Sequence, residues 1–179
     1  SVRVPAAWNN LVGLKTTHSL LSLKGVVPLC PRFDTVGPIV KTVEDATNFL
    51  SMLLGKNQIS LIDDELATKK LAVIETTFLD NLDNEVSVSF EHSIDLLTKR
   101  GVRITRLKSN IVSDAMALSA LIFSPDAYGT WKDLIEKNPE KMQKPVLERF
   151  RSGQEVRGPS YVSAWQNLEK LREHYFSLV

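Results

Sequence analysis

The sequence has little of several features that define common classes of protein. It contains one cysteine among 179 residues, so it cannot form an internal disulfide or a thiol-rich metal site. Its 22 Lys and Arg residues nearly balance 21 Asp and Glu, and the net charge of +1 excludes a strongly basic nucleic-acid binder. No apolar run approaches the roughly 18 residues that a membrane span needs, and no basic and apolar leader opens the chain. These absences predict a soluble, cytoplasmic globular protein.

Familiar catalytic and nucleotide-binding motifs are missing as well. The chain has no GxGxxG, GxxxxGK[ST], HExxH, CxxC or GxSxG pattern. His18, His92 and His174 are widely separated and have no ligand neighbours at metal-site spacing, so we expect no metal site. Cys30 is expected to be a small buried hydrophobe rather than a catalytic thiolate, because no base accompanies it. The tryptophans are expected to pack rather than to stack on bases: Trp8, Trp131 and Trp165.

The first forty residues differ in kind from the rest. They hold three glycines and four prolines at spacings that break the chain into turns and short strands. Residues 11–15 and 20–27 contain apolar runs of strand length. Residues 1–40 are therefore predicted to supply strands and turns rather than long helices.

Residues 41–110 are predicted to alternate between helices and strands. Thr42 is a natural N-cap for a helix that Gly55 ends, and a second helix over 84–100 ends at Gly101. Strands over 70–74 and 102–107 flank this second helix. Because a strand, helix, strand order places the crossover on one face of a sheet, it predicts parallel pairing.

Residues 111–179 are predicted to be mainly helical. An apolar stripe that begins at Ile111 is expected to end at Pro125, followed by a short helix over 131–136, another over 145–151 and the strongest helix over 160–177. The whole chain is therefore predicted to be α/β, a mixed sheet flanked by helices with a helix-rich C-terminal third. We expect 1–179 to be a single partial domain.

Five short motifs follow one another within the first 46 residues. They are SVRVPAA at 1–7, VGLK at 12–15, GVVP at 25–28, DTVGP at 34–38 and TVEDA at 42–46. None of them is specific alone, but in this order and at these intervals the set resembles the second half of the amidase signature. That signature marks a family of serine hydrolases, and the resemblance is strong up to Ala46 and loose beyond it.

The resemblance implies a mechanism and a nucleophile. Members of this family hydrolyse carboxylic amides through an acyl-enzyme with a Ser–cis-Ser–Lys triad, and Ser1 with Arg3 matches the end of their Gly-Gly-Ser-hydrophobe-Arg turn. The resemblance places the relay serine and the base lysine upstream of Ser1, and Lys15 and Lys24 do not match that lysine. We therefore expect the chain to be a fragment that is inactive alone, since a serine hydroxyl needs a base.

The roles of Ser1 and Arg3 have alternatives. Ser1 matches the family nucleophile, but a serine left at the terminus by cloning or an N-terminal nucleophile assisted by its own amine would also occupy this position. Arg3 could bind a substrate carboxylate, although a brace of the turn through an internal Asp is favoured. Asp34 and Thr35 fit a turn and cap in the same framework.

The resemblance implies hydrolysis of non-peptide C–N bonds in a small amide, without a metal or an organic cofactor. We expect no membrane contact and no direct nucleic-acid binding, and the chain could form a homo-oligomer. One alternative is the glutaminase component, the A subunit, of a tRNA-dependent amidotransferase. The other is a non-catalytic module that keeps the amidase framework.

Overall fold

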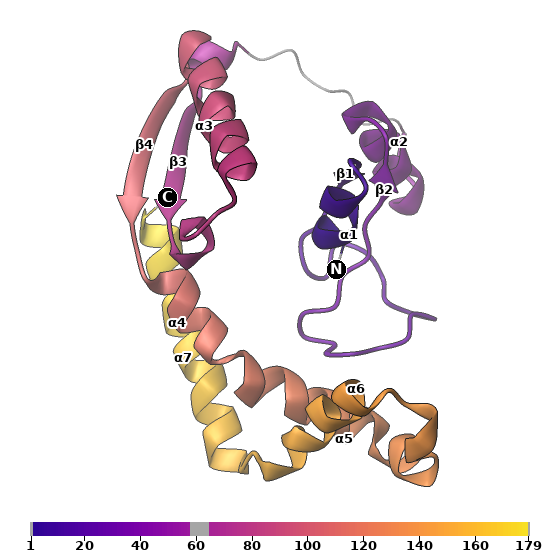
Figure 1. The fold of residues 1–179 in the computed structure, drawn as a ribbon. Coiled ribbons are helices and arrows are strands. Elements are labelled where there is room, and N and C mark those ends of the chain that lie inside the picture. The colour runs from indigo at the N-terminus through magenta and orange to yellow at the C-terminus, as the bar shows by residue number, and fades with distance from the viewer. Residues whose placement is uncertain (1, 58–64, 179) are drawn as a thin grey trace. The chain divides into compact units, whose positions relative to one another are not determined.

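The computed structural model describes residues 2–57 and 65–178 and divides the chain into two compact units, Ser1–Asp63 and Asp64–Val179. The first unit contains helix α1 (Arg3–Trp8), strands β1 (Val12–Gly13) and β2 (Ile39–Val40), and helix α2 (Val43–Leu53). β1 and β2 pair antiparallel, with Val12 opposite Val40 and Gly13 opposite Ile39. These elements are labelled in Figure 1.

One expectation for the first unit, a strand within 20–27, is wrong and two are confirmed, while a short helix over 3–8 was not predicted. Residues 3–8 form a helix, which Pro5 permits because a proline in the first turn needs no N–H. Residues 20–27 form turns rather than a strand, and Gly25 has a φ of +83° there. The short strand within 11–15 and the helix after Thr42 are confirmed. Gly55 follows that helix with a φ of +61°, a left-handed conformation that glycine adopts without steric cost.

The second unit begins with a parallel strand pair. Strand β3 (Lys70–Glu75) pairs with β4 (Arg103–Lys108), and helix α3 (Asn84–Lys99) connects them and contacts β4. The register aligns Lys70 with Arg103 and Glu75 with Lys108. The predicted strand, helix, strand order and its parallel pairing are thus confirmed, and Gly101, with a φ of +87°, ends the helix. Short 3-10 turns, η1 (Leu66–Thr68) and η2 (Thr77–Leu79), flank β3.

The remainder of the second unit is helical. It consists of α4 (Ile111–Ala117), α5 (Ser119–Lys137), α6 (Lys144–Arg151) and α7 (Gly158–Leu178), with 3-10 turns η3 (Pro139–Lys141) and η4 (Ser152–Glu155). α7 contacts α4 and α5, and it buries Ala164, Trp165 and Leu168. The α/β class and the helix-rich final third are confirmed.

Pro125 does not end a helix, contrary to the sequence-based expectation. It lies inside α5, which continues through residues 131–136 without a break. The buried Gly153 of η4 packs there, since a Cβ on Gly153 would lie 2.1 Å from the Ser124 carbonyl oxygen and 2.8 Å from the Pro125 nitrogen. The proline removes one intrahelical hydrogen bond from α5. At this same point α5 is in close contact with η4.

The tryptophans do not behave alike. Trp165 is buried, Trp131 is partly buried, and Trp8 is 85% exposed, so the expectation that Trp8 packs is wrong.

None of the helices within 2–57 and 65–178 has the length and apolarity that crossing a membrane requires.

Candidate functional site

Ser1, the predicted nucleophile, lies outside the described residues, and helix α1 begins two residues after it, at Arg3. The Val2 carbonyl accepts a hydrogen bond from the Ala6 N–H at 3.2 Å in the first turn of α1. Gly13 of β1 lies against this turn, since a Cβ there would lie 2.6 Å from both the Val2 oxygen and the Ala6 Cβ. Only glycine lets β1 approach this closely, and β1 therefore helps fix the residue next to Ser1.

The VGLK and DTVGP motifs lie side by side. A Cβ on Gly37 would lie 2.0 Å from the Leu14 carbonyl oxygen, and the Leu14 N–H donates to the Pro38 carbonyl at 3.0 Å. The hydroxyl of Thr16, which is 4% exposed, donates to the Val36 carbonyl at 2.7 Å. Two motifs separated by eighteen residues of sequence thus form one backbone framework.

Asp34 organises the turn that precedes this framework. Its carboxylate accepts hydrogen bonds from the backbone N–H groups of Leu29 at 2.8 Å and Cys30 at 3.1 Å. The expectation of a turn feature at Asp34 is confirmed, and Cys30, with 0% exposure, is the expected buried hydrophobe. Thr42, in the TVEDA motif, caps α2, because its hydroxyl accepts a hydrogen bond from the Asp45 N–H at 3.0 Å.

The sequence singled out three cations in this segment, Arg3, Lys15 and Lys24. Arg3 is exposed, and none of the described aspartates forms an ion pair with it, so the favoured brace is not found in this part of the chain. The amino group of Lys15 donates to the Thr16 carbonyl at 2.5 Å, and Lys24 is exposed.

The histidines stay apart. A ring nitrogen of His18, Nε2, lies 3.1 Å from the Pro31 carbonyl oxygen, while His92 and His174 are exposed. Within residues 2–57 and 65–178, no three His, Cys, Asp or Glu side chains are grouped to hold a metal ion.

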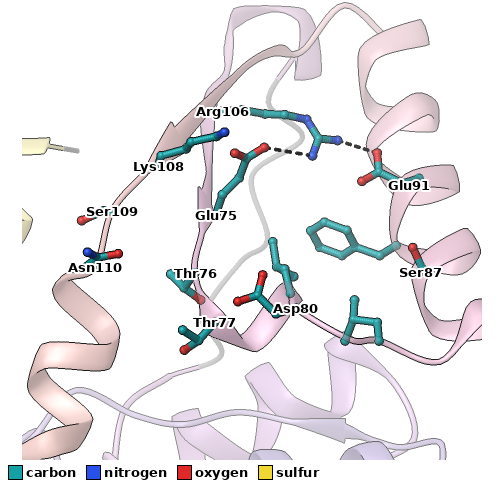
Figure 2. A pocket seen from close by; sticks show the side chains of 13 residues that line it. Glu75, Thr76, Thr77, Asp80, Ser87, Glu91, Arg106, Lys108, Ser109 and Asn110 are labelled. Carbon is teal, nitrogen blue, oxygen red and sulfur yellow. Dashed lines mark hydrogen bonds and ion pairs between the residues drawn. The ribbon is translucent and has the colours of Figure 1, made fainter.

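A cavity of about 510 Å³ opens in the second unit, where the parallel strands end (Figure 2). Its walls come from the ends of β3 and β4, from the η2 segment and from α3. The charged residues that line it are Glu75, Asp80, Glu91, Arg106 and Lys108. Ligands of open α/β sheets bind beyond the carboxyl ends of the strands, and this cavity lies at that edge.

A charged triad spans the cavity. The Arg106 guanidinium reaches from β4 to Glu91 on α3, with which it forms a hydrogen-bonded ion pair, and to Glu75 at 3.6 Å (Figure 2). The hydrogen bond to Glu91, followed by the charge of the same carboxylate, raises the pKa of Arg106. Arg106 is therefore a permanent cation with a fixed orientation.

This cavity was not predicted from the sequence. The strand over 102–107 was predicted from its apolar residues. Arg106 and Lys108 are two residues apart, so they lie on the same face of the strand, and this spacing could have indicated a polar face. Glu91 lies fifteen residues from Arg106, so their pairing depends on how α3 packs and not on a local pattern.

A second polar cluster joins α5 to α6. Arg151 donates to the two carboxylate oxygens of Glu136 at 3.0 and 2.7 Å, and Tyr128 donates to the same carboxylate at 3.3 Å. The hydrogen bond from Arg151 lowers the pKa of Glu136, while desolvation chiefly raises the pKa of Tyr128. These hydrogen bonds connect α5 with α6, so we assign the cluster a structural role.

Comparison with known proteins identifies the framework of the first unit. The family model described as Amidase matches residues 1–175. The chain belongs to the amidase family. The expected resemblance to the amidase signature is thereby confirmed, and the match reaches far beyond the five motifs on which that expectation was based.

Individual amidase relatives support this assignment. The A subunit of the glutamyl-tRNA(Gln) amidotransferase of Pseudothermotoga lettingae is 31% identical over an alignment of 140 residues, which covers 71% of this chain and 30% of that protein. A solved amidase structure aligns with a TM-score of 0.85 at 22% identity, over 98% of this chain and 40% of the other. The peptide amidase of Stenotrophomonas maltophilia aligns with a TM-score of 0.71 at 20% identity, over 93% of this chain and 42% of the other.

The amidase chain spans about a third of the curated relative and two fifths of the solved structures. The two structural matches, both under 25% identical, show that the fold is shared.

Proposed function

We propose that the protein containing this chain hydrolyses the C–N bond of a small, non-peptide carboxylic amide through an acyl-enzyme on Ser1. The observation that carries the proposal is the family match over residues 1–175, which includes Ser1 and all five signature motifs. The packing of Gly13 against the Val2 carbonyl supports it, because this contact fixes the residue that follows Ser1.

The proposed reaction has two steps. The Ser1 hydroxyl oxygen attacks the amide carbonyl carbon and loses its proton, the C–N bond breaks, and the leaving amine takes up a proton. Water then attacks the seryl ester, the carboxylic acid departs, and Ser1 regains a proton. Resemblance to the family assigns the proton transfers to a relay serine and a lysine that precede Ser1, and assigns oxyanion stabilisation to the N–H groups of its glycine-rich turn.

Several further properties belong to the same proposal. The 179-residue chain alone is inactive, because the resemblance places the relay serine and the lysine outside it. We also propose that residues 1–179 form part of one larger cytoplasmic domain that uses no cofactor, binds no nucleic acid directly and can form a homo-oligomer.

A serine-directed fluorophosphonate tests the proposal. The 179-residue chain and a version extended upstream through the serine and lysine are treated in parallel, and an adduct on Ser1 is sought by peptide mass spectrometry. We expect labelling of the extended chain only, and none after a Ser1→Ala change in that chain. Labelling of the short chain would show that a group within it activates Ser1. Absence of labelling in both would favour the non-catalytic module.

The glutaminase component of a tRNA-dependent amidotransferase is the second candidate. The relative from Pseudothermotoga lettingae is named as a component of such an enzyme, and this observation favours the second candidate as much as the stand-alone amidase. A glutaminase of this kind would release ammonia from glutamine and pass it to partner proteins.

Substrate profiling separates the two candidates. The extended chain is incubated with glutamine and with a panel of simple aliphatic and aromatic amides, and ammonia release is measured for each. Turnover of simple amides by the chain alone supports the stand-alone hydrolase. Turnover of glutamine, increased by co-purified partner proteins, supports the amidotransferase component.

A further inference from the structure

The cavity at the ends of β3 and β4 has a composition that helix-on-sheet packing does not require. Helices normally cover a sheet with apolar side chains, yet α3 turns Ser87 and Glu91 into this space beside Phe90. The ion pairs of Arg106 with Glu75 and Glu91 are partly exposed to solvent, and ion pairs of this kind add little to the stability of a fold. The volume of about 510 Å³ lies in the range that small-molecule sites occupy.

The charges in the cavity leave one group of each sign without a counter-ion. Arg106 is shared by Glu75 and Glu91. Among the residues that the structure describes, neither the Asp80 carboxylate nor the Lys108 amino group has an ion pair or a side-chain hydrogen bond. Both side chains line the same cavity and both are exposed, so a ligand can reach them without unfolding.

The remaining lining groups complete a pattern. Thr77, Ser87 and Asn110 offer neutral polar side chains, and Leu79, Leu82 and Phe90 supply an apolar wall. Figure 2 shows the threonines and Asp80 near the end of β3 and Ser87 on α3. A ligand for this cavity therefore needs one cationic group, one anionic group and an apolar substituent.

We propose that this cavity binds a zwitterionic amino acid with an apolar side chain. Its ammonium group donates to the Asp80 carboxylate, its carboxylate accepts from Lys108, and its side chain packs against Leu79, Leu82 and Phe90. The site belongs to β3, β4 and α3, and it does not depend on Ser1 chemistry. Ammonium and carboxylate contacts are both charge-assisted, and these are the stronger kind of hydrogen bond.

Three probes of nearly the same size test the proposal on the 179-residue chain. L-phenylalanine carries both charges, phenethylamine lacks the carboxylate, and 3-phenylpropanoate lacks the ammonium group. Amide chemical shifts of the ¹⁵N-labelled chain are followed during titration with each probe up to about 10 mM, which detects affinities in the millimolar range. We expect saturable shifts around Asp80, Ser87 and Asn110, with phenylalanine bound about tenfold more tightly than either analogue.

Two variants assign the contacts. Asp80→Asn should weaken phenylalanine binding about tenfold and remove its advantage over 3-phenylpropanoate. Lys108→Met should remove its advantage over phenethylamine. Asp95→Asn and Lys99→Met change charges of the same kind on positions of α3 that do not line the cavity, and they should leave all affinities unchanged.

The outcomes that overturn the proposal are equally definite. They are the absence of saturable shifts, equal affinity for the three probes, or an effect of the α3 control variants as large as that of Asp80→Asn. None of these results bears on whether Ser1 is labelled by a fluorophosphonate, so this site and the proposed amidase activity succeed or fail separately.

Discussion

Gly13 and Gly37 are required because another backbone segment lies too close to leave room for a Cβ, and not because of a turn. Neither has a positive φ, but a Cβ would lie 2.6 Å from the Val2 oxygen at Gly13 and 2.0 Å from the Leu14 oxygen at Gly37. Contacts under 3.0 Å force backbone or neighbouring atoms to move. Two glycines of the signature thus hold α1, β1 and the segment before β2 together.

Replacement of Gly13 by alanine should destabilise the first unit. The added methyl group would overlap the Val2 carbonyl and the Ala6 side chain, and overpacking of this kind costs about 1–3 kcal/mol. Urea unfolding monitored by circular dichroism measures the loss. Gly129→Ala is the matched control: Gly129 lies in α5 with open space around it, so that change should be neutral or slightly stabilising. Equal stability of the Gly13→Ala variant and the original chain would contradict the packing argument.

The pair formed by Glu136 and Arg151 should make stability depend on pH. The pKa of Glu136 is lowered in the folded chain, so the pair stabilises the fold above the unfolded-state pKa, and this stabilisation is lost as pH falls through the folded-state pKa. Arg151→Met should lower the melting temperature near neutral pH and have little effect in acid, where Glu136 is protonated in both chains.

The control for this pair is Lys144→Met. Lys144 and Glu148 are 3.9 Å apart and largely exposed, so their ion pair should contribute nothing measurable at either pH. A constant difference between the Arg151→Met variant and the original chain at all pH values would show that Arg151 acts through packing instead.

At the scale of elements, α5 shows how tertiary contact modifies a local rule. Proline inside a helix removes one hydrogen bond and crowds the preceding turn. In α5 this point of weakness coincides with the close approach of Gly153 from η4. The helix continues from Ser119 to Lys137 and therefore does not end at the proline.

The start of α2 offers a direct test of a cap. Thr42→Ala removes the hydroxyl that accepts from the Asp45 N–H, and loss of such a cap costs about 0.5–2 kcal/mol. Thermal unfolding of the variant should show this loss. Thr98→Ala is the control, because the Thr98 hydroxyl donates to a carbonyl within α3 and caps no helix end. If both changes cost the same, the effect reflects the loss of a threonine side chain and not of the cap.

At the scale of the whole molecule, large apolar side chains remain exposed in both units. Among the described residues the most exposed of these are Trp8, Val27, Met52 and Phe176. Exposed apolar patches favour association, because burying them removes apolar surface from water. The chain should therefore associate with itself as its concentration rises.

Sedimentation velocity over a range of concentrations measures this association. Val27→Ser and Phe176→Ser together should shift the distribution toward the monomer, whereas Lys24→Ser and Lys170→Ser should not, because Lys24 and Lys170 are exposed and charged. A single monomeric species at every concentration would show that the exposed side chains do not drive association.

Much of the fold could be predicted from sequence because its signals are local. The Thr42 cap and the glycines at 55 and 101 act on the residues beside them, and the pairing of β3 with β4 depends on element order. The family assignment was also available, since it needs only the order and spacing of short motifs. The role of Ser1 stays a prediction, because Ser1 lies outside the described residues.

Other features were decided only by the tertiary structure. The triad joins Glu75, Glu91 and Arg106 across gaps of fifteen residues or more, and the close approaches of Gly13 and Gly153 depend on which segments become neighbours. By itself the sequence determined the order of most helices and strands and the family, because propensities, caps and motif spacing act over a few residues. The path of α5 through Pro125 and the charged cavity were set by packing, because their energies come from contacts between segments that no local pattern brings together.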